Sequence, residues 1–206
     1  MNSEPLVLTP VQRFLKRSID LLGAIVGIFF LWPIMLIGWC AATLSTGQNG
    51  LFIQQRVGRH GELFKLLKLR SMKSASHTTT TVTAKTDARI TRVGQVLRKL
   101  KIDELPQLLN VAAGHMSLVG PRPDVPGFAD RLEGPDRAIL SIRPGITGPA
   151  SIHFRNEEDL LAEQSDPERY NREVIWPKKI EINLEYLKHQ SALSDLKYIW
   201  QTVFRP

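Results

Sequence analysis

Two adjacent acidic residues, Asp103 and Glu104, lie in a segment that is otherwise basic and apolar (LRKLKIDELPQLLN). Arg98 and two lysines surround the pair at a distance of a few positions. Two carboxylates beside several cations can hold Mg²⁺ together with a phosphorylated substrate, and a carboxylate can also attack phosphorus as a nucleophile. The alternative is structural: Pro106 suits the first turn of a helix, which would make Asp103 the N-cap of that helix.

A second candidate is the segment SLVGPRP, which places Arg122 between Pro121 and Pro123. Each proline fixes its own φ, and Pro123 also restricts the backbone of Arg122. A guanidinium group on such a stiff loop loses little entropy when it binds a phosphate. The alternative is a tight structural loop that carries a surface arginine.

A third segment, RPGITGPASIHFRN, contains a turn and a further arginine. Pro144 and Gly145 fit the central positions of a type II turn, in which the glycine has a positive φ. Arg155 follows a short apolar piece with the pattern of a strand, and by itself it is only a basic residue near a turn. The histidines and the cysteine lack metal-ligand spacing, and no Walker, dinucleotide-binding or nucleophile-elbow motif occurs.

The elements that position these residues include an uncharged apolar run from Leu21 to Leu44. A straight helix over the run would be roughly 36 Å long, enough to cross a hydrocarbon core of about 30 Å. Pro33, near its centre, predicts a bend. Basic residues flank both ends, and the positive-inside rule therefore places both ends on the same side of the membrane. A re-entrant helix within one leaflet satisfies both observations, and a single span with a kink is an equal alternative at this point.

The composition indicates a partner that carries phosphate. The formal net charge is +7, which suits an anionic lipid, a nucleotide or a nucleic acid. Aromatic and basic residues do not interleave in a stacking pattern, which disfavours nucleic acid as the partner. The only cysteine, Cys40, lies in the apolar run, so the chain forms no internal disulfide and fits a reducing compartment. The run is too long for a cleaved signal, which predicts a retained anchor with a domain on the cytoplasmic face.

The sequence predicts an α+β, mainly helical chain with three parts: a polar tail (1–12), a re-entrant membrane helix (13–46) and a compact cytoplasmic catalytic domain (47–206). Short apolar stretches on both sides of Arg59–Gly61 predict a small β element of two strands.

Helical periodicity follows over Arg89–Ala113. The threonine-rich segment Ser74–Thr86 predicts a mobile loop. The stretch from Leu184 to Phe204 predicts amphipathic helix, which either lies in the membrane interface or packs on the core of the domain.

The chain resembles the monotopic phosphoglycosyl transferases, the bacterial sugar transferase family that begins the assembly of surface glycans on a polyprenyl carrier. The resemblance runs from about Lys16 to the C-terminus and is carried by KRSID, QQRVG, FKLLKLRSM, DELPQ, GPRP and RPGITG. The last three motifs, in this order, are highly specific together. Three features depart from the family pattern. Trp32 replaces a serine before the central proline, PASIHFRN follows RPGITG in place of the usual continuation, and Asn183 stands where an aspartate is common.

The resemblance implies a two-step transfer of a sugar-1-phosphate from a UDP-sugar to polyprenyl (undecaprenyl) phosphate, with release of UMP. Asp103 would be the nucleophile and form an aspartyl phosphosugar. Glu104 would help to hold Mg²⁺ or Mn²⁺ together with Asp103, and Arg98, Arg122 and Arg155 would bind substrate phosphates. The family also implies a place in the bacterial inner membrane, on its cytoplasmic face, with downstream glycosyltransferases as further partners.

Two other functions stay open at this stage. A metal-dependent hydrolase of nucleotide diphosphosugars would release UMP without any lipid acceptor. A basic, membrane-anchored adaptor would bind anionic lipid or nucleic acid and release no UMP, but it leaves the pair Asp103–Glu104 unexplained.

Overall fold

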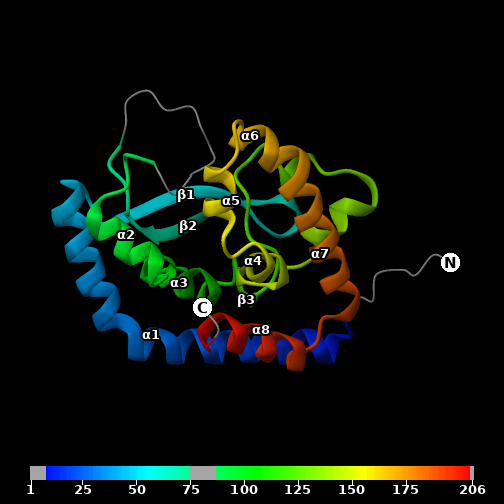
Figure 1. The fold of residues 1–206 in the computed structure, drawn as a ribbon. Helices are drawn as coiled ribbons and strands as arrows, with labels where there is room; N and C mark the ends of the chain where they lie inside the picture. The colour runs from blue at the N-terminus through cyan, green and yellow to red at the C-terminus, as the bar shows by residue number, and fades with distance from the viewer. Residues whose placement is uncertain (1–7, 75–86, 205–206) are drawn as a thin grey trace.

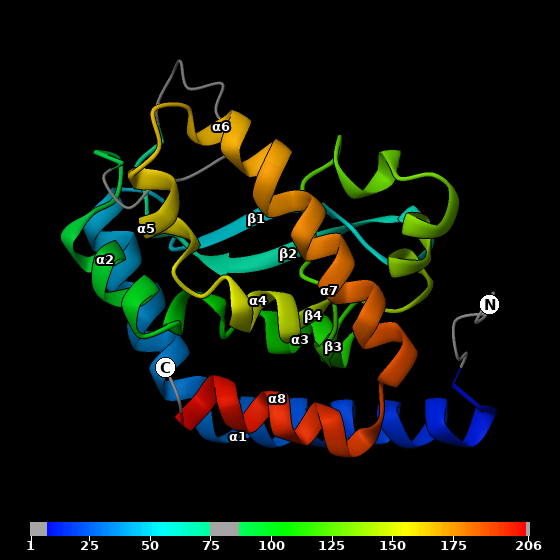
Figure 2. The same ribbon diagram turned by 45° about the vertical axis from the view of Figure 1, so that its right-hand side comes forward.

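The structure, a computed structural model, describes residues 8–74 and 87–204. It is a mainly helical α+β fold in which one long helix, α1, runs along the base and one side of the remaining body (Figures 1 and 2). The helices are α1 (Pro10–Thr46), α2 (Arg92–Lys99), α3 (Gln107–Ala112), α4 (Pro149–His153), α5 (Glu157–Ala162), α6 (Pro167–Tyr170), α7 (Trp176–His189) and α8 (Ala192–Phe204). The strands are β1 (Leu51–Val57), β2 (Leu63–Leu69), β3 (Ser117–Val119) and β4 (Gly145–Thr147).

The strands form two small sheets. β1 and β2 are antiparallel, pair Leu51 with Leu69, and enclose the predicted turn at Arg59–Gly61, so this prediction is confirmed. β3 and β4 are parallel, although the sequence predicted only loop and turn at both places. The predicted mobile loop, beyond Ser74, lies outside the described residues.

Helix α1 begins at Pro10, before the start predicted at residue 13, and ends at Thr46 as predicted. The early start has a local cause, because Thr9 and Gln12 form a capping box. Thr9 Oγ1 accepts a hydrogen bond from Gln12 N at 3.2 Å, and Gln12 Oε1 accepts one from Thr9 N at 2.9 Å. Pro10 occupies the first helical position, where its missing N–H costs nothing.

The bend predicted in the apolar run is present. Figures 1 and 2 show α1 running along the base and then turning upward about midway, with the outer side of the bend facing away from the body. Pro33 lies inside the helix and accounts for the change of direction, since it removes one backbone hydrogen bond. Large apolar side chains are exposed along both halves, among them Phe14, Leu22, Ile25, Phe29, Phe30, Ile37 and Leu44.

The inner face of α1 carries small residues where the body packs against it. A Cβ atom on Gly23 would lie 2.7 Å from Leu118 Cδ1, and one on Gly38 would lie 2.6 Å from Leu69 Cδ1. Ala24 is fully buried in a core cluster with side chains of β2 and α3. These small residues let the body contact the helix backbone closely, so the apolar bulk of α1 points outward.

The predicted C-terminal amphipathic stretch consists of two helices with different surroundings. α7 packs on the body through buried residues such as Ile180 and Leu187. α8 lies alongside the first half of α1 in both views. It leaves several large apolar side chains exposed, namely Leu193, Leu196, Trp200, Val203 and Phe204.

The predicted type II turn at Pro144–Gly145 is wrong. Gly145 is the first residue of β4 and does not have a positive φ. Its missing side chain serves packing instead, because a Cβ atom there would lie 2.1 Å from Gly120 N. Gly148 is constrained in the same way, since a Cβ atom on it would lie 2.3 Å from Gly120 O. The glycines of this segment therefore allow β4 to contact the backbone that follows β3.

We expect Gly145→Ala to lower the free energy of unfolding by about 1–3 kcal/mol, since the added methyl group would displace backbone rather than a flexible side chain. Urea denaturation of the detergent-solubilised protein measures the change. Gly27→Ala is the control, because the nearest atom to its Cβ, at 3.0 Å, is a terminal methyl group of Leu108 that can move. Equal midpoints for the two variants would contradict the packing argument.

Candidate functional site

Asp103 and Glu104 lie in a single 3₁₀ turn, Ile102–Glu104, between α2 and α3. Lys101, just before the turn, has a φ of 56° and so reverses the direction of the chain after α2. Because α3 begins only at Gln107, Asp103 is not its N-cap, and the structural alternative for this residue is wrong. Both carboxylates are buried instead, with 6% of Asp103 and 9% of Glu104 exposed.

Glu104 is held by two cations from other parts of the chain. Arg122 donates to both carboxylate oxygens: its Nη1 lies 3.3 Å from Oε2, and its Nη2 contacts Oε1. Lys68 Nζ lies 3.4 Å from Oε1. Burial alone would raise the pKa of Glu104, but the charges of Arg122 and Lys68 lower it well below its usual range. Glu104 therefore favours its ionised form, and its contacts fix the guanidinium group of Arg122.

Asp103 differs sharply from its neighbour. Its Oδ1 atom is buried and has no hydrogen-bond partner within the described part of the chain. Burial, and then the negative charge of Glu104, raise the pKa of Asp103, while Lys68 and Arg98 oppose the rise. A buried polar atom without a partner costs free energy, and such atoms mark places where a ligand completes the contacts. Asp103 is thus the carboxylate with an oxygen available for chemistry.

The pair suits a metal ion that is shared with a bound phosphate. Mg²⁺ in phosphate sites typically takes one or two protein carboxylates and fills its remaining positions with phosphate oxygens and water. Asp103 offers its unpartnered oxygen. Glu104 accepts three of the roughly four hydrogen bonds that a carboxylate can take, which leaves one position for a metal ion. Among residues 8–74 and 87–204 no group of three or more His, Cys, Asp or Glu could hold a metal. The donor set therefore fits Mg²⁺ only in company with substrate.

Arg98, predicted to bind phosphate, lies close enough to Asp103 to lower its pKa. Its guanidinium group pairs with Glu158 on α5, and its Nη1 lies 3.7 Å from Met72 Sδ. The Glu158 side chain is 46% exposed. A phosphate can therefore replace Glu158 as the partner of Arg98 without leaving the Glu158 carboxylate buried and unpaired. The structure thus brings Arg98 and Arg122 together around the carboxylate pair.

Arg155 follows helix α4 and contacts α8. The piece before it is helix α4 and not the strand that its pattern predicted. Arg155 Nη2 donates to Gln201 O of α8 at 3.3 Å, beside a depression of about 470 Å³. The depression is lined by Ile152, His153, Arg155, Asn156, Leu160 and Gln201. Arg155 is therefore placed next to α8.

Lys68 and Arg56 belong to this site but were not predicted from the sequence. Lys68 shares a face of β2 with the buried Phe64 and Leu66. A lysine on the inward face of a predicted strand was the sequence signal that could have indicated a role in the site. Arg56 Nη1 donates to Pro123 O at 3.2 Å, which supports the loop of Arg122. Burial and the charge of Arg122 lower the pKa of Arg56 to about 10. Arg56 and Lys68 thus add two cations to the surroundings of Arg122 and the carboxylate pair, which suits a phosphate ligand.

Comparison with known proteins identifies the class. The family profile described as "Bacterial sugar transferase" matches residues 11–205, and the chain belongs to this family. It is 36% identical over 202 residues to UDP-N-acetylgalactosamine-undecaprenyl-phosphate N-acetylgalactosaminephosphotransferase of Aeromonas hydrophila, covering 95% of this chain and 44% of the relative. It is 33% identical over 216 residues to UDP-glucose:undecaprenyl-phosphate glucose-1-phosphate transferase of Escherichia coli, covering 100% of this chain and 44% of the relative.

A shorter relative matches along most of its length. The exopolysaccharide production protein ExoY of Rhizobium meliloti is 32% identical over 213 residues, which cover 94% of this chain and 86% of ExoY. The chain spans less than half the length of the Aeromonas and Escherichia relatives.

Proposed function

We propose that this protein transfers a sugar-1-phosphate from a UDP-sugar to polyprenyl (undecaprenyl) phosphate and releases UMP. The observation that carries the proposal is the buried, unpartnered oxygen of Asp103 beside a second carboxylate that is fixed by Arg122 and Lys68. The names of the Aeromonas and Escherichia relatives, which pair UDP-sugars with undecaprenyl phosphate, support the choice of substrates.

In the first step, a carboxylate oxygen of Asp103 attacks the β-phosphorus of the UDP-sugar. The bond from this phosphorus to the bridging oxygen breaks, and UMP leaves with that oxygen. In the second step, an oxygen of polyprenyl phosphate attacks the same phosphorus, the bond to Asp103 breaks, and the carboxylate is restored. The product is a polyprenyl diphosphosugar, which glycosyltransferases that extend lipid-linked sugars would consume.

The cations serve both steps in the same way. Phosphoryl transfer needs alignment and neutralisation of charge more than covalent help from the protein. Arg122 lies against Glu104 and can turn one N–H toward a phosphate, and Arg98 can exchange Glu158 for a phosphate oxygen. Bound Mg²⁺ or Mn²⁺ would neutralise phosphate charge and favour the ionised form of Asp103.

The same proposal places α1 in one leaflet of the bacterial inner membrane, entering and leaving from the cytoplasmic face. Three features support this topology: the bend, the apolar side chains exposed along both of its halves, and the basic residues that flank the run. α8 lies beside the first half of α1 with an exposed apolar face, as an interfacial helix would. The site is thereby held where a lipid-borne phosphate can meet a nucleotide sugar from the cytosol.

We expect the double substitution Leu193→Glu and Leu196→Glu to weaken binding of the protein to lipid vesicles about 10-fold or more, because two exposed apolar contacts of α8 become charged. Vesicle flotation measures the bound fraction. Val174→Glu is the control, since Val174 is 49% exposed but lies in the π-helical segment Asn171–Ile175 between α6 and α7. Equal losses of vesicle binding in both variants would show that α8 does not contact the membrane.

The function is tested by incubating the full chain with UDP-sugars, Mg²⁺ and undecaprenyl phosphate, and by following UMP and lipid-linked sugar. We expect one equivalent of UMP from donor alone and continued release only with the lipid acceptor. Continued UMP release without lipid would indicate a hydrolase. Binding to anionic lipid without any UMP release, over a panel of UDP-sugars, would indicate an adaptor.

A further inference from the structure

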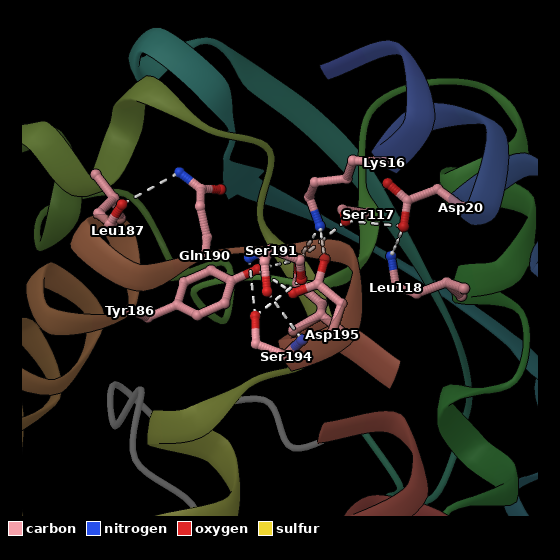
Figure 3. A network of polar contacts seen from close by, with 11 residues as sticks. Lys16, Asp20, Ser117, Leu118, Tyr186, Leu187, Gln190, Ser191, Ser194 and Asp195 are labelled. Atoms are coloured by element: carbon pink, nitrogen blue, oxygen red, sulfur yellow. Dashed lines mark hydrogen bonds and ion pairs between the residues drawn. The ribbon is translucent and has the colours of Figure 1, made fainter. Parts of the chain in front are cut away.

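A buried polar network joins α1 to the C-terminal helices, away from the carboxylate pair (Figure 3). Lys16 Nζ forms a short ion pair with Asp195 Oδ2 of α8. Tyr186 Oη of α7 donates to the other oxygen of Asp195 at 2.7 Å. Asp195 is 4% exposed, so its charge depends on these partners.

The same stretch of α1 also holds strand β3. Lys16 Nζ donates to Val119 O at 3.1 Å. Asp20 Oδ1 accepts hydrogen bonds from Ser117 Oγ at 3.0 Å and from Leu118 N at 2.9 Å (Figure 3). All three residues of β3 are therefore bonded to α1 through polar groups.

β3 leads directly into the loop that carries Arg122. After Val119 the chain continues through Gly120 and Pro121, whose carbonyl oxygen accepts from Gly145 N at 2.8 Å. This short connection is stiff, because Pro121 has a fixed φ and Gly120 packs against the backbone of β4. A displacement of β3 relative to α1 would consequently move Arg122.

We propose that Lys16, Asp20 and Asp195 are positioning residues that fix the height of the phosphate-binding loop relative to the membrane. This inference rests on the proposed function and on the placement of α1 and α8 at the lipid surface. Charged groups buried together are costly compared with apolar packing, and they define one geometry where apolar contacts would allow several. The network ties both membrane-facing helices to β3, and through β3 to Arg122.

The two substrates should respond differently to a loss of this link. The UDP-sugar is soluble and can follow a displaced loop, whereas the phosphate of the lipid acceptor is held at the depth set by the bilayer. Loss of the network should therefore impair the second step more than the first. The difference should be largest in a bilayer and smaller in detergent micelles, where no fixed plane holds the acceptor.

The test compares Asp195→Asn and Lys16→Met with Lys197→Met, which removes an exposed charge from α8. We expect the first two variants to keep the donor-only release of UMP and to lose about 10-fold in transfer to undecaprenyl phosphate in bilayer nanodiscs. In micelles the loss should be about threefold or less, and Lys197→Met should resemble the wild type in both media.

Each single variant leaves one buried charge without its partner, which can cause misfolding. The double variant Lys16→Met with Asp195→Leu removes both charges and so avoids this effect. It should show the same split between donor and acceptor steps. The inference would be overturned if UMP release and lipid transfer fell in parallel, if transfer fell equally in nanodiscs and micelles, or if transfer did not change. Absence of UMP release from the wild type would instead overturn the proposed function.

Discussion

Asp103→Asn is expected to abolish sugar-phosphate transfer, with kcat reduced by about 10⁴-fold, a loss of the size found when a covalent nucleophile is removed. The amide has nearly the same shape as the carboxylate but cannot form an acyl phosphate. The loss should appear in donor-only UMP release as well as in lipid-linked product, because both depend on the first attack. Asp136→Asn, at an exposed position, is the matched control.

The same variant should keep or gain stability. Burial and the charge of Glu104 raise the pKa of Asp103, so the folded protein disfavours its ionised form. A neutral amide removes this repulsion and breaks no hydrogen bond at Oδ1. Urea midpoints equal to or above that of the wild type would agree with this explanation. Full turnover by Asp103→Asn would rule out the mechanism.

Arg122→Met is expected to reduce kcat by about 10²–10³-fold, which is typical when one donor to a developing oxyanion is lost. Arg122 is the cation that contacts both oxygens of Glu104, so in the proposed mechanism its loss removes a phosphate contact and leaves Lys68 as the cation paired with that carboxylate among the described residues. Steady-state kinetics with both substrates measures the change. Arg172→Met, an exposed arginine beyond α6, is the matched control.

Two further variants sharpen this prediction. Glu104→Gln combined with Arg122→Met should cost less than the sum of the single changes, because both alter one ion pair. Arg155→Met should have a smaller effect than Arg122→Met, since Arg122 contacts both oxygens of Glu104 whereas Arg155 donates to Gln201 O of α8. Equal effects of the two arginine variants would mean that the depression beside Arg155 belongs to the phosphate site.

Features set by local chemistry were predictable from the sequence. The bend in the apolar run follows from one proline, and the β1–β2 hairpin follows from short apolar stretches around a turn. The pair Asp103–Glu104 and the arginine between two prolines were visible as motifs. Their contact was not, because Arg122 reaches Glu104 only through the tertiary fold.

The wrong predictions for Gly145 and Asp103 share one cause, which is that tertiary packing overrode a local pattern. Gly145 looked like a turn residue but is needed for close contact with Gly120. Asp103 looked like an N-cap, yet its carboxylate is buried beside Glu104. Lys68 was missed because its partner lies far away in the sequence.

Trp32, which stands before the proline of the bend, keeps about half of its surface exposed. Nothing in the described part of the structure explains why a tryptophan occupies this position.

The central claim is that a covalent aspartyl phosphosugar forms on the enzyme. The most direct test is intact-protein mass spectrometry after incubation with UDP-sugar and Mg²⁺, without lipid acceptor. The mechanism predicts an added mass of one sugar phosphate, located on Asp103 by fragmentation, absent from Asp103→Asn, and removed by hydroxylamine or by undecaprenyl phosphate. The mechanism would be contradicted if the protein formed lipid-linked sugar without ever carrying this added mass, or if the adduct lay on another residue.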